Sequence, residues 1–131
     1  MSISTFYRRP ILPLATVLLT IGFHSPTIAA GNSEHGAIVF QEECSDCHSV
    51  APGKNKKGPS LFGVVGRDPA MIEGYNYSDG MRANHTAWTP DRLDAYIAAP
   101  KKTVPGAKMK YDGLSNESDR ADVIAYLSGQ H

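Results

Sequence analysis

The sequence lacks an excess of charge of either sign, because 13 basic residues balance 13 acidic ones. This balance argues against nucleic acid as a partner. The sequence also has no internal repeat and no low-complexity tract. No run of five or more residues alternates convincingly between apolar and polar side chains, so strands are not expected. These absences leave a small helical protein as the fold class to test.

A long apolar run that would span a bilayer comfortably is missing as well. Ile11–Phe23 is too short for this and follows the basic pair Arg8 and Arg9. Small residues come next and end at Ala30, which is the layout of a secretory signal peptide. Prolines within and beside the run disfavour the alternative, an uncleaved anchor helix.

We therefore expect residues 1–30 to be a cleavable signal peptide and residues 31–131 to form a single domain. Export predicts a periplasmic location, with no stable membrane insertion after processing. The mature chain would carry two fewer basic than acidic side chains, because only basic residues are lost with the signal. A chain of this size has a small core, which a bound cofactor would help to complete.

Three helices are predicted in the mature chain. The first covers residues 33–46, with Ser33 as its N-cap and an apolar face that includes Phe40 and Cys44. The second begins at Thr89-Pro90, where proline suits the first helical position, and is expected to stop at Pro100.

The third helix is predicted over residues 116–128, from Asn116 to a left-handed C-terminal Gly129. Residues 49–87 form a connection rich in glycine and proline, unusually long for a compact domain. Such a loop is easier to understand if it wraps a large internal object. The pattern predicts an all-α domain of three main helices with long loops around a cofactor.

The strongest motif is Cys44-Ser45-Asp46-Cys47-His48, which matches the C-x-x-C-H signal for covalent haem attachment. Thiols three residues apart share one face of a helical turn and can reach the two vinyl groups of one porphyrin edge. The following imidazole can then approach the iron. A zinc site, a thioredoxin-like pair and a simple Cys44–Cys47 disulfide are the alternatives; the first would need further ligands and the second a βαβ setting.

The ligand on the side of the iron opposite the histidine distinguishes an electron carrier from a catalyst. Methionine opposite histidine suits electron transfer, whereas an open site suits a peroxidase-like enzyme or a gas sensor. The mature chain offers Met71, Met81 and Met109. Spacing alone does not choose among them, and any methionine also serves as core filler.

From Gly36 to Leu127 the chain resembles the class I cytochromes c, of the mitochondrial and bacterial c2 type. The resemblance is carried by several motifs in order besides Cys44–His48. They are Gly58-Pro59-Ser60-Leu61-Phe62-Gly63-Val64-Val65-Gly66-Arg67, Gly74-Tyr75-Asn76-Tyr77-Ser78-Asp79, Trp88, the run from Tyr96 to Met109, and Asp122-Val123-Ile124-Ala125-Tyr126-Leu127.

The resemblance implies a small cytochrome c fold with one haem c per chain, bound through Cys44 and Cys47. It implies His48 and Met109 as axial ligands of the iron, and the Pro59 carbonyl as the acceptor for the His48 ring. The remaining roles it implies are haem propionate contacts by Arg67, Tyr77 and Trp88, a position close to the methionine sulfur for Tyr96, and a contact between the terminal helices through Gly36, Phe40 and Tyr126.

Two positions depart from the family pattern. Met81 stands where many relatives carry asparagine, and Ala107 where they carry threonine. Both family side chains belong to a buried polar network near the haem, so we predict that this network is altered here. Glu42 and Glu43 also lie just before the haem signal, where many relatives are basic.

Lysines cluster in the two loops that should frame the haem edge, and we expect them to steer docking to acidic surfaces. They are Lys56, Lys57, Lys101, Lys102, Lys108 and Lys110. The alternative is an ordinary solvated set of lysines.

The function expected is that of a monomeric, exported electron carrier of a respiratory chain rather than an enzyme. Candidate partners are a bc1-type complex, a terminal oxidase, a photosynthetic reaction centre and an exported dehydrogenase.

Overall fold

The computed structural model describes residues 30–131. The predicted signal peptide therefore lies outside the described residues, apart from Ala30. Helices account for all the regular secondary structure in residues 30–131, in the order α1, η1, α2, α3, α4 and α5. The all-α prediction is confirmed for this range. No helix within it is long and apolar enough to cross a membrane.

The first helix, α1, spans Ser33–Val39 and passes directly into a π-helical turn, η1, at Phe40–Cys44. In this turn the N–H of Ser45 donates to the Phe40 carbonyl five residues earlier, at 2.9 Å. The prediction of a regular α-helix through residue 46 is therefore wrong from Phe40 onward. Single π turns occur inside helices, frequently at functional sites, and a 3.6-residue pattern does not reveal them.

Asn32, and not Ser33, caps α1. Its side-chain oxygen accepts the N–H groups of Glu34 at 2.9 Å and His35 at 3.1 Å. Asn32 has extended backbone angles, whereas Ser33 is already helical. The expected N-cap was thus displaced by one residue, between two residue types that both suit the position.

The second predicted helix is α3, Pro90–Ala98, and its Thr89 cap is confirmed because the Thr89 side chain accepts the N–H of Arg92 at 3.2 Å. As expected, α3 ends just before Pro100, and Pro100 then opens a separate short helix, α4, Pro100–Thr103. The break lies at Ala99, whose φ of −150° is not helical. Proline fits the first position of the new helix because its missing N–H would have no partner there.

A second short helix, α2, Asp79–Arg82, was not predicted; it is capped by Ser78. The last helix, α5, spans Glu117–Ser128, with the expected Asn116 as its cap. Gly129 follows it with a φ of −87° in the right-handed region, so the expected left-handed ending is wrong.

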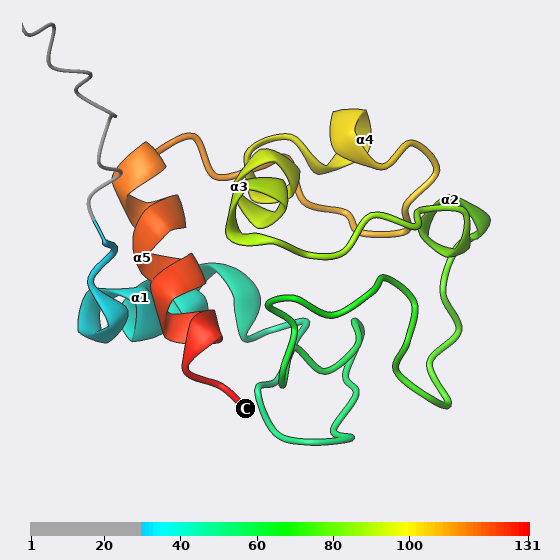
Figure 1. The fold of residues 1–131 in the computed structure, drawn as a ribbon, viewed down its shortest axis with the longest axis horizontal. Helices are drawn as coiled ribbons and strands as arrows, with labels where there is room; N and C mark the ends of the chain where they lie inside the picture. The colour runs from blue at the N-terminus through cyan, green and yellow to red at the C-terminus, as the bar shows by residue number, and fades with distance from the viewer. Residues whose placement is uncertain (1–29) are drawn as a thin grey trace, which may run out of the picture.

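Figure 1 shows α1 and α5 crossing at one end of the molecule, with α3 and α4 along one side and the long green loop on the other. The core lies between these parts. Its buried side chains are Val39, Phe40, Val64, Trp88, Leu93, Tyr96, Val104, Val123, Ile124 and Leu127. It thus unites both terminal helices, α3 and the loop segments on either side of it.

The backbones of α1 and α5 approach each other closely at Gly36. A Cβ atom at this position would overlap the Asp122 carbonyl and touch the Tyr126 side chain. One helical turn further, the rings of Phe40 and Tyr126 pack with their centroids 5.5 Å apart. The predicted contact between the terminal helices through these residues is confirmed, and glycine permits it because it has no side chain.

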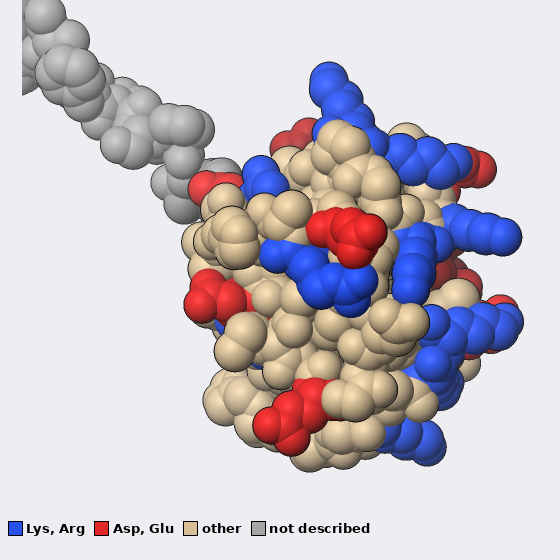
Figure 2. Space-filling view, turned by 90° about the vertical axis from the view of Figure 1, so that its right-hand side faces the viewer, with Lys and Arg blue, Asp and Glu red and all other residues tan. Residues whose placement is uncertain are grey.

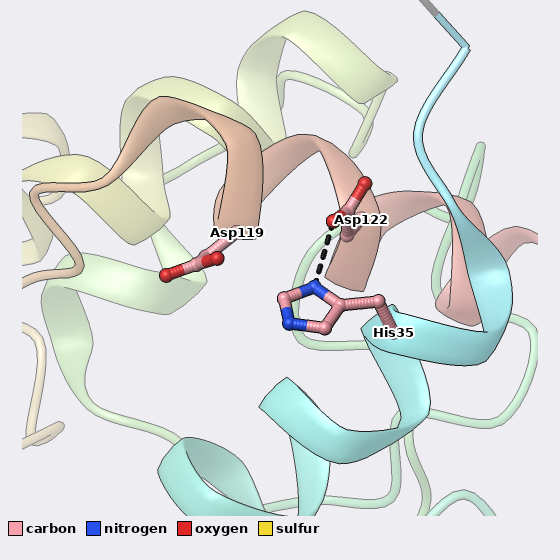
Figure 3. A group of neighbouring side chains, drawn as sticks. All are labelled: His35, Asp119 and Asp122. Atoms are coloured by element: carbon pink, nitrogen blue, oxygen red, sulfur yellow. Dashed lines mark hydrogen bonds and ion pairs between the residues drawn. The ribbon is translucent and has the colours of Figure 1, made fainter.

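Asp122 of α5 also stabilises this crossing, and Figure 3 shows its contact with His35 of α1. Its carboxylate pairs with Nδ1 of His35 at 2.8 Å and accepts the N–H of Asn32 at 2.6 Å. The Asn32 hydrogen bond, followed by the His35 contact, lowers the pKa of Asp122. Asp119 lies nearby, so the group has the donors of a metal site. However, both Asp122 oxygens and the facing nitrogen are already engaged, and the group is explained as a fastening between helices.

The crossing predicts opposite effects for two glycine-to-alanine changes. Alanine normally stabilises a helix by about 1 kcal/mol relative to glycine, but at Gly36 its Cβ has no space. We expect Gly36→Ala to lower the free energy of unfolding by about 2 kcal/mol through overpacking.

Gly129→Ala is the matched control. At this position the nearest atom to a new Cβ is the Tyr126 carbonyl oxygen at 3.5 Å, and φ is acceptable for alanine. Chemical denaturation should show no loss, or a gain below about 1 kcal/mol. Equal effects of the two changes would contradict the close crossing.

Candidate functional site

The Cys44–His48 segment forms a closed turn directly after η1. The N–H groups of Cys47 and His48 both donate to the Cys44 carbonyl, at 3.1 and 2.9 Å. Both cysteines are free thiols, so the alternative of a disulfide between them is not realised. Burial, then the nearby Glu43 and Cys47, raise the pKa of Cys44 to about 11. The turn thus presents two thiols and an imidazole from five consecutive residues.

The His48 imidazole is held by the loop that follows. Its Nδ1 lies 2.8 Å from the Pro59 carbonyl oxygen, which accepts only if Nδ1 carries the proton. The other nitrogen, Nε2, then keeps its lone pair for a metal. Burial lowers the pKa of His48, which favours the neutral, ligating form. Gly58 packs so closely against the His48 ring that a Cβ atom at Gly58 would overlap the ring.

The three methionines have different surroundings. The hydroxyl of Tyr96 donates to the sulfur of Met109 at 3.9 Å. Burial raises the pKa of Tyr96 to about 12, so it remains a donor at neutral pH. Met71 is 62% exposed, and Met81 packs against the core from α2. Met109 alone among the three combines partial burial with a hydrogen bond to its sulfur in the described structure.

Cys44 and Met109 both pack against the same buried cluster. The structure therefore brings the attachment turn and the Met109 loop to one core, although Cys44 and Met109 are 65 positions apart in the sequence. Met81 and Ala107, the two departures from the family pattern, also pack there. The altered network predicted for these two positions stays a prediction.

Arg67 occupies the loop that follows Gly58-Pro59. Its guanidinium donates to the backbone carbonyls of Phe62 at 2.5 Å and Ser60 at 3.1 Å. Burial lowers the pKa of Arg67, although such a group stays charged at neutral pH. Arg67 thus stabilises the loop through main-chain oxygens, and the propionate contact implied for it stays a prediction.

Tyr77 and Trp88 are both buried, at 8% and 6% exposure. The Tyr77 hydroxyl accepts the N–H of Ile72 at 3.4 Å. Trp88 packs against Tyr96 with ring centroids 4.9 Å apart. This pair connects the predicted propionate region to the residue beside the Met109 sulfur.

The predicted docking lysines are all exposed, and three of them make contacts within the chain. Lys56 donates to the Ser45 carbonyl, Lys108 to that of Asn76, and Lys101 pairs with Asp112. Figure 2 shows many basic side chains projecting along one edge of the visible face, with acidic ones scattered among and beyond them.

One contact of this region was missed by the sequence reasoning. The hydroxyl of Tyr111 donates to the Glu43 carboxylate at 2.8 Å. Burial and this hydrogen bond raise the pKa of Tyr111. The two residues are 68 positions apart, and no sequence motif connects them.

These residues fit a c-type haem. The turn offers two thiols for thioether bonds and an imidazole whose Nε2 is free to bind iron, and Met109 offers a thioether sulfur from another loop. A zinc site fits less well. Within residues 30–131, the group of three donors close enough for a metal ion is the His35 cluster, and it does not include Cys44, Cys47 or His48.

Comparisons with known proteins agree with this assignment. The family profile described as cytochrome c matches residues 33–130. Cytochrome c2 of Rhodopila globiformis is 47% identical over 97 residues, which cover 74% of this chain and 92% of that protein. Cytochrome c of Gibberella zeae is 43% identical over 101 residues, covering 76% and 95%.

The "cytochrome c-type cyt cy" of Rhodobacter capsulatus is 46% identical over 103 residues, or 79% of this chain. The match spans about half of that relative, 51% of its length. Among solved structures, cytochrome cH from Methylobacterium extorquens superposes with a TM-score of 0.71 at 37% identity. That match covers 75% of this chain and 98% of the solved one.

The packing of Gly58 on the His48 ring predicts a cost for any side chain there. We expect Gly58→Ala to lower the free energy of unfolding of the haem-loaded protein by about 1–3 kcal/mol, because the ring or the loop must move. Lys57→Ala, an exposed change at the preceding residue, should stay within about 0.5 kcal/mol. Denaturant titration measures both, and an unchanged Gly58→Ala would show that the ring is not held there.

Proposed function

Because this chain belongs to the class I cytochrome c family of electron carriers and so bears a covalent haem c, we propose that His48 and Met109 are the axial ligands of its haem iron. We also propose that the protein is exported and shuttles single electrons between redox partners. The bound haem supplies a one-electron iron couple, which methionine opposite histidine places at a raised potential. Family members are typically carriers rather than enzymes.

The observation that carries the ligand proposal is the pair of hydrogen bonds on the two ligand side chains. The His48 Nδ1–Pro59 contact leaves Nε2 for the iron, and the Tyr96–Met109 contact orients the sulfur on the other loop. Each contact fixes a side chain before an electron arrives, so little rearrangement accompanies the change of charge. A site in which both ligand side chains already have hydrogen-bond partners would suit a carrier better than a catalyst that must bind substrate.

Export to the periplasm is the second part of the proposal. It rests on the signal-peptide pattern of residues 1–30. Haem attachment through Cys44 and Cys47 also consumes the two thiols of the chain, which removes them from oxidation in that compartment. We propose a monomer that meets a bc1-type complex or an exported dehydrogenase as donor, and a terminal oxidase or photosynthetic reaction centre as acceptor.

The ligand proposal predicts the optical spectrum of the oxidised protein. Wild-type protein should show the weak near-infrared band of sulfur-to-iron charge transfer, and Met109→Ala should lose it. Met71→Ala is the matched control, because Met71 is 62% exposed, and it should keep the band. If Met109→Ala retains the band, a different residue ligates the iron.

Steering by the basic face predicts sensitivity to ionic strength. We expect Lys102→Gln/Lys110→Gln to slow electron transfer to a purified cytochrome c oxidase severalfold at low salt, and the difference to fade near 0.15 M, where the screening length is about 8 Å.

The control variant, Ser115→Glu/Ser118→Glu, changes the net charge equally at two exposed positions at the start of α5. It should slow transfer less. Equal slowing by both variants, or a wild-type rate independent of salt, would contradict steering by this particular face.

A further inference from the structure

The loop that carries Met109 has little main-chain support. Ala107 donates its N–H to the Val104 carbonyl at 3.1 Å, and Leu114 donates to that of Ile97 at 3.0 Å. Between them, residues 108–113 take part in no backbone–backbone hydrogen bond within the described part of the chain. A segment of this kind opens at lower free energy than the helices that flank it. Its position must therefore depend on side chains.

Three side-chain contacts hold this loop besides that of Met109 itself. Lys108 donates to the Asn76 carbonyl at 3.0 Å, and Asp112 pairs with Lys101 of α4 at 2.7 Å. The Lys101–Asp112 pair is exposed on both sides, at 70% and 95%, and is therefore worth little. The third contact is the hydrogen bond from Tyr111 to Glu43.

The Tyr111–Glu43 contact differs from the other two in where it leads. Glu43 lies in η1 and directly precedes Cys44, the first attachment cysteine. Tyr111 lies two residues after Met109. The hydrogen bond therefore joins the loop that carries Met109, a proposed ligand of the haem iron, to the helical turn that carries Cys44, a haem attachment residue. A phenol donating to a carboxylate also forms a stronger bond than a neutral pair.

We propose that Tyr111 and Glu43 act as a clasp that keeps the Met109 loop closed, and that this clasp sets how readily Met109 is displaced from the iron. The inference rests on the proposed ligation by Met109. Tyr111 and Glu43 are positioning residues, since they act through the loop that carries Met109. Breaking the clasp shifts the loop towards its open form without changing the ligand itself.

Binding of free imidazole to the oxidised, haem-loaded protein measures this opening. Imidazole takes the methionine position only when the loop opens, so its apparent affinity rises with the open population. At constant pH and salt, we expect Tyr111→Phe to raise that affinity about three- to five-fold, as the loss of one partly exposed hydrogen bond implies. Glu43→Ala should have the same effect.

Three further variants make the test specific. The double variant Tyr111→Phe/Glu43→Ala should match either single one, because the second change removes nothing more. Glu43→Gln keeps an acceptor oxygen and should restore part of the wild-type affinity. Tyr75→Phe removes a comparable hydroxyl, which donates to the Lys57 carbonyl at 2.8 Å, and should leave imidazole binding unchanged.

Met109→Ala separates failure of the clasp from failure of the ligand proposal. If wild-type protein binds imidazole as tightly as Met109→Ala does, Met109 is not the ligand and the proposed function fails at that point. If wild type binds more weakly but Tyr111→Phe matches wild type, the clasp is overturned. Additive effects in the double variant, or an equal effect of Tyr75→Phe, would overturn it as well.

Discussion

The close crossing of α1 and α5 at Gly36 is the constraint on which the rest of the structure depends. Without a side chain at Gly36, the backbone of α1 reaches the Asp122 carbonyl of α5, and Phe40 can then pack on Tyr126. The crossing sets the direction of α1 and of η1, which continues it, and Cys44 at the end of η1 packs against the core. One missing Cβ atom therefore positions the attachment turn relative to the C-terminal helix.

Local sequence signals were sufficient to predict a helix start where the residue types at the start act on the backbone within a few residues. The Thr89-Pro90 start of α3 and the Asn116 start of α5 were predictable because capping oxygens and a proline at the first helical position act within a few residues. The π turn at Phe40–Cys44 was not, since an extra residue per turn leaves the composition unchanged. Gly129 ends α5 without using the left-handed region that glycine permits.

The candidate site likewise has parts that the sequence predicted and parts that it did not. The C-x-x-C-H motif predicted the attachment chemistry from five residues, because that chemistry is local. Spacing did not choose among Met71, Met81 and Met109, since the choice depends on which loop folds back to the core. The structure distinguishes them through the Tyr96 hydroxyl beside the Met109 sulfur and the exposure of Met71. The Tyr111–Glu43 contact joins residues too far apart in sequence for any local pattern to reveal it.

Residues 108–113 make no backbone–backbone hydrogen bonds within residues 30–131. The free energy of opening this loop is therefore separate from the free energy of unfolding the whole domain. Global unfolding must separate α1 from α5, whereas release of the loop breaks only side-chain contacts. Substitutions that remove a side-chain contact of the loop, at Lys108 or Tyr111 for example, therefore alter local opening while the helical scaffold keeps its free energy of unfolding. The ease with which the Met109 loop opens can therefore change by substitution without a change in the stability of the helical fold.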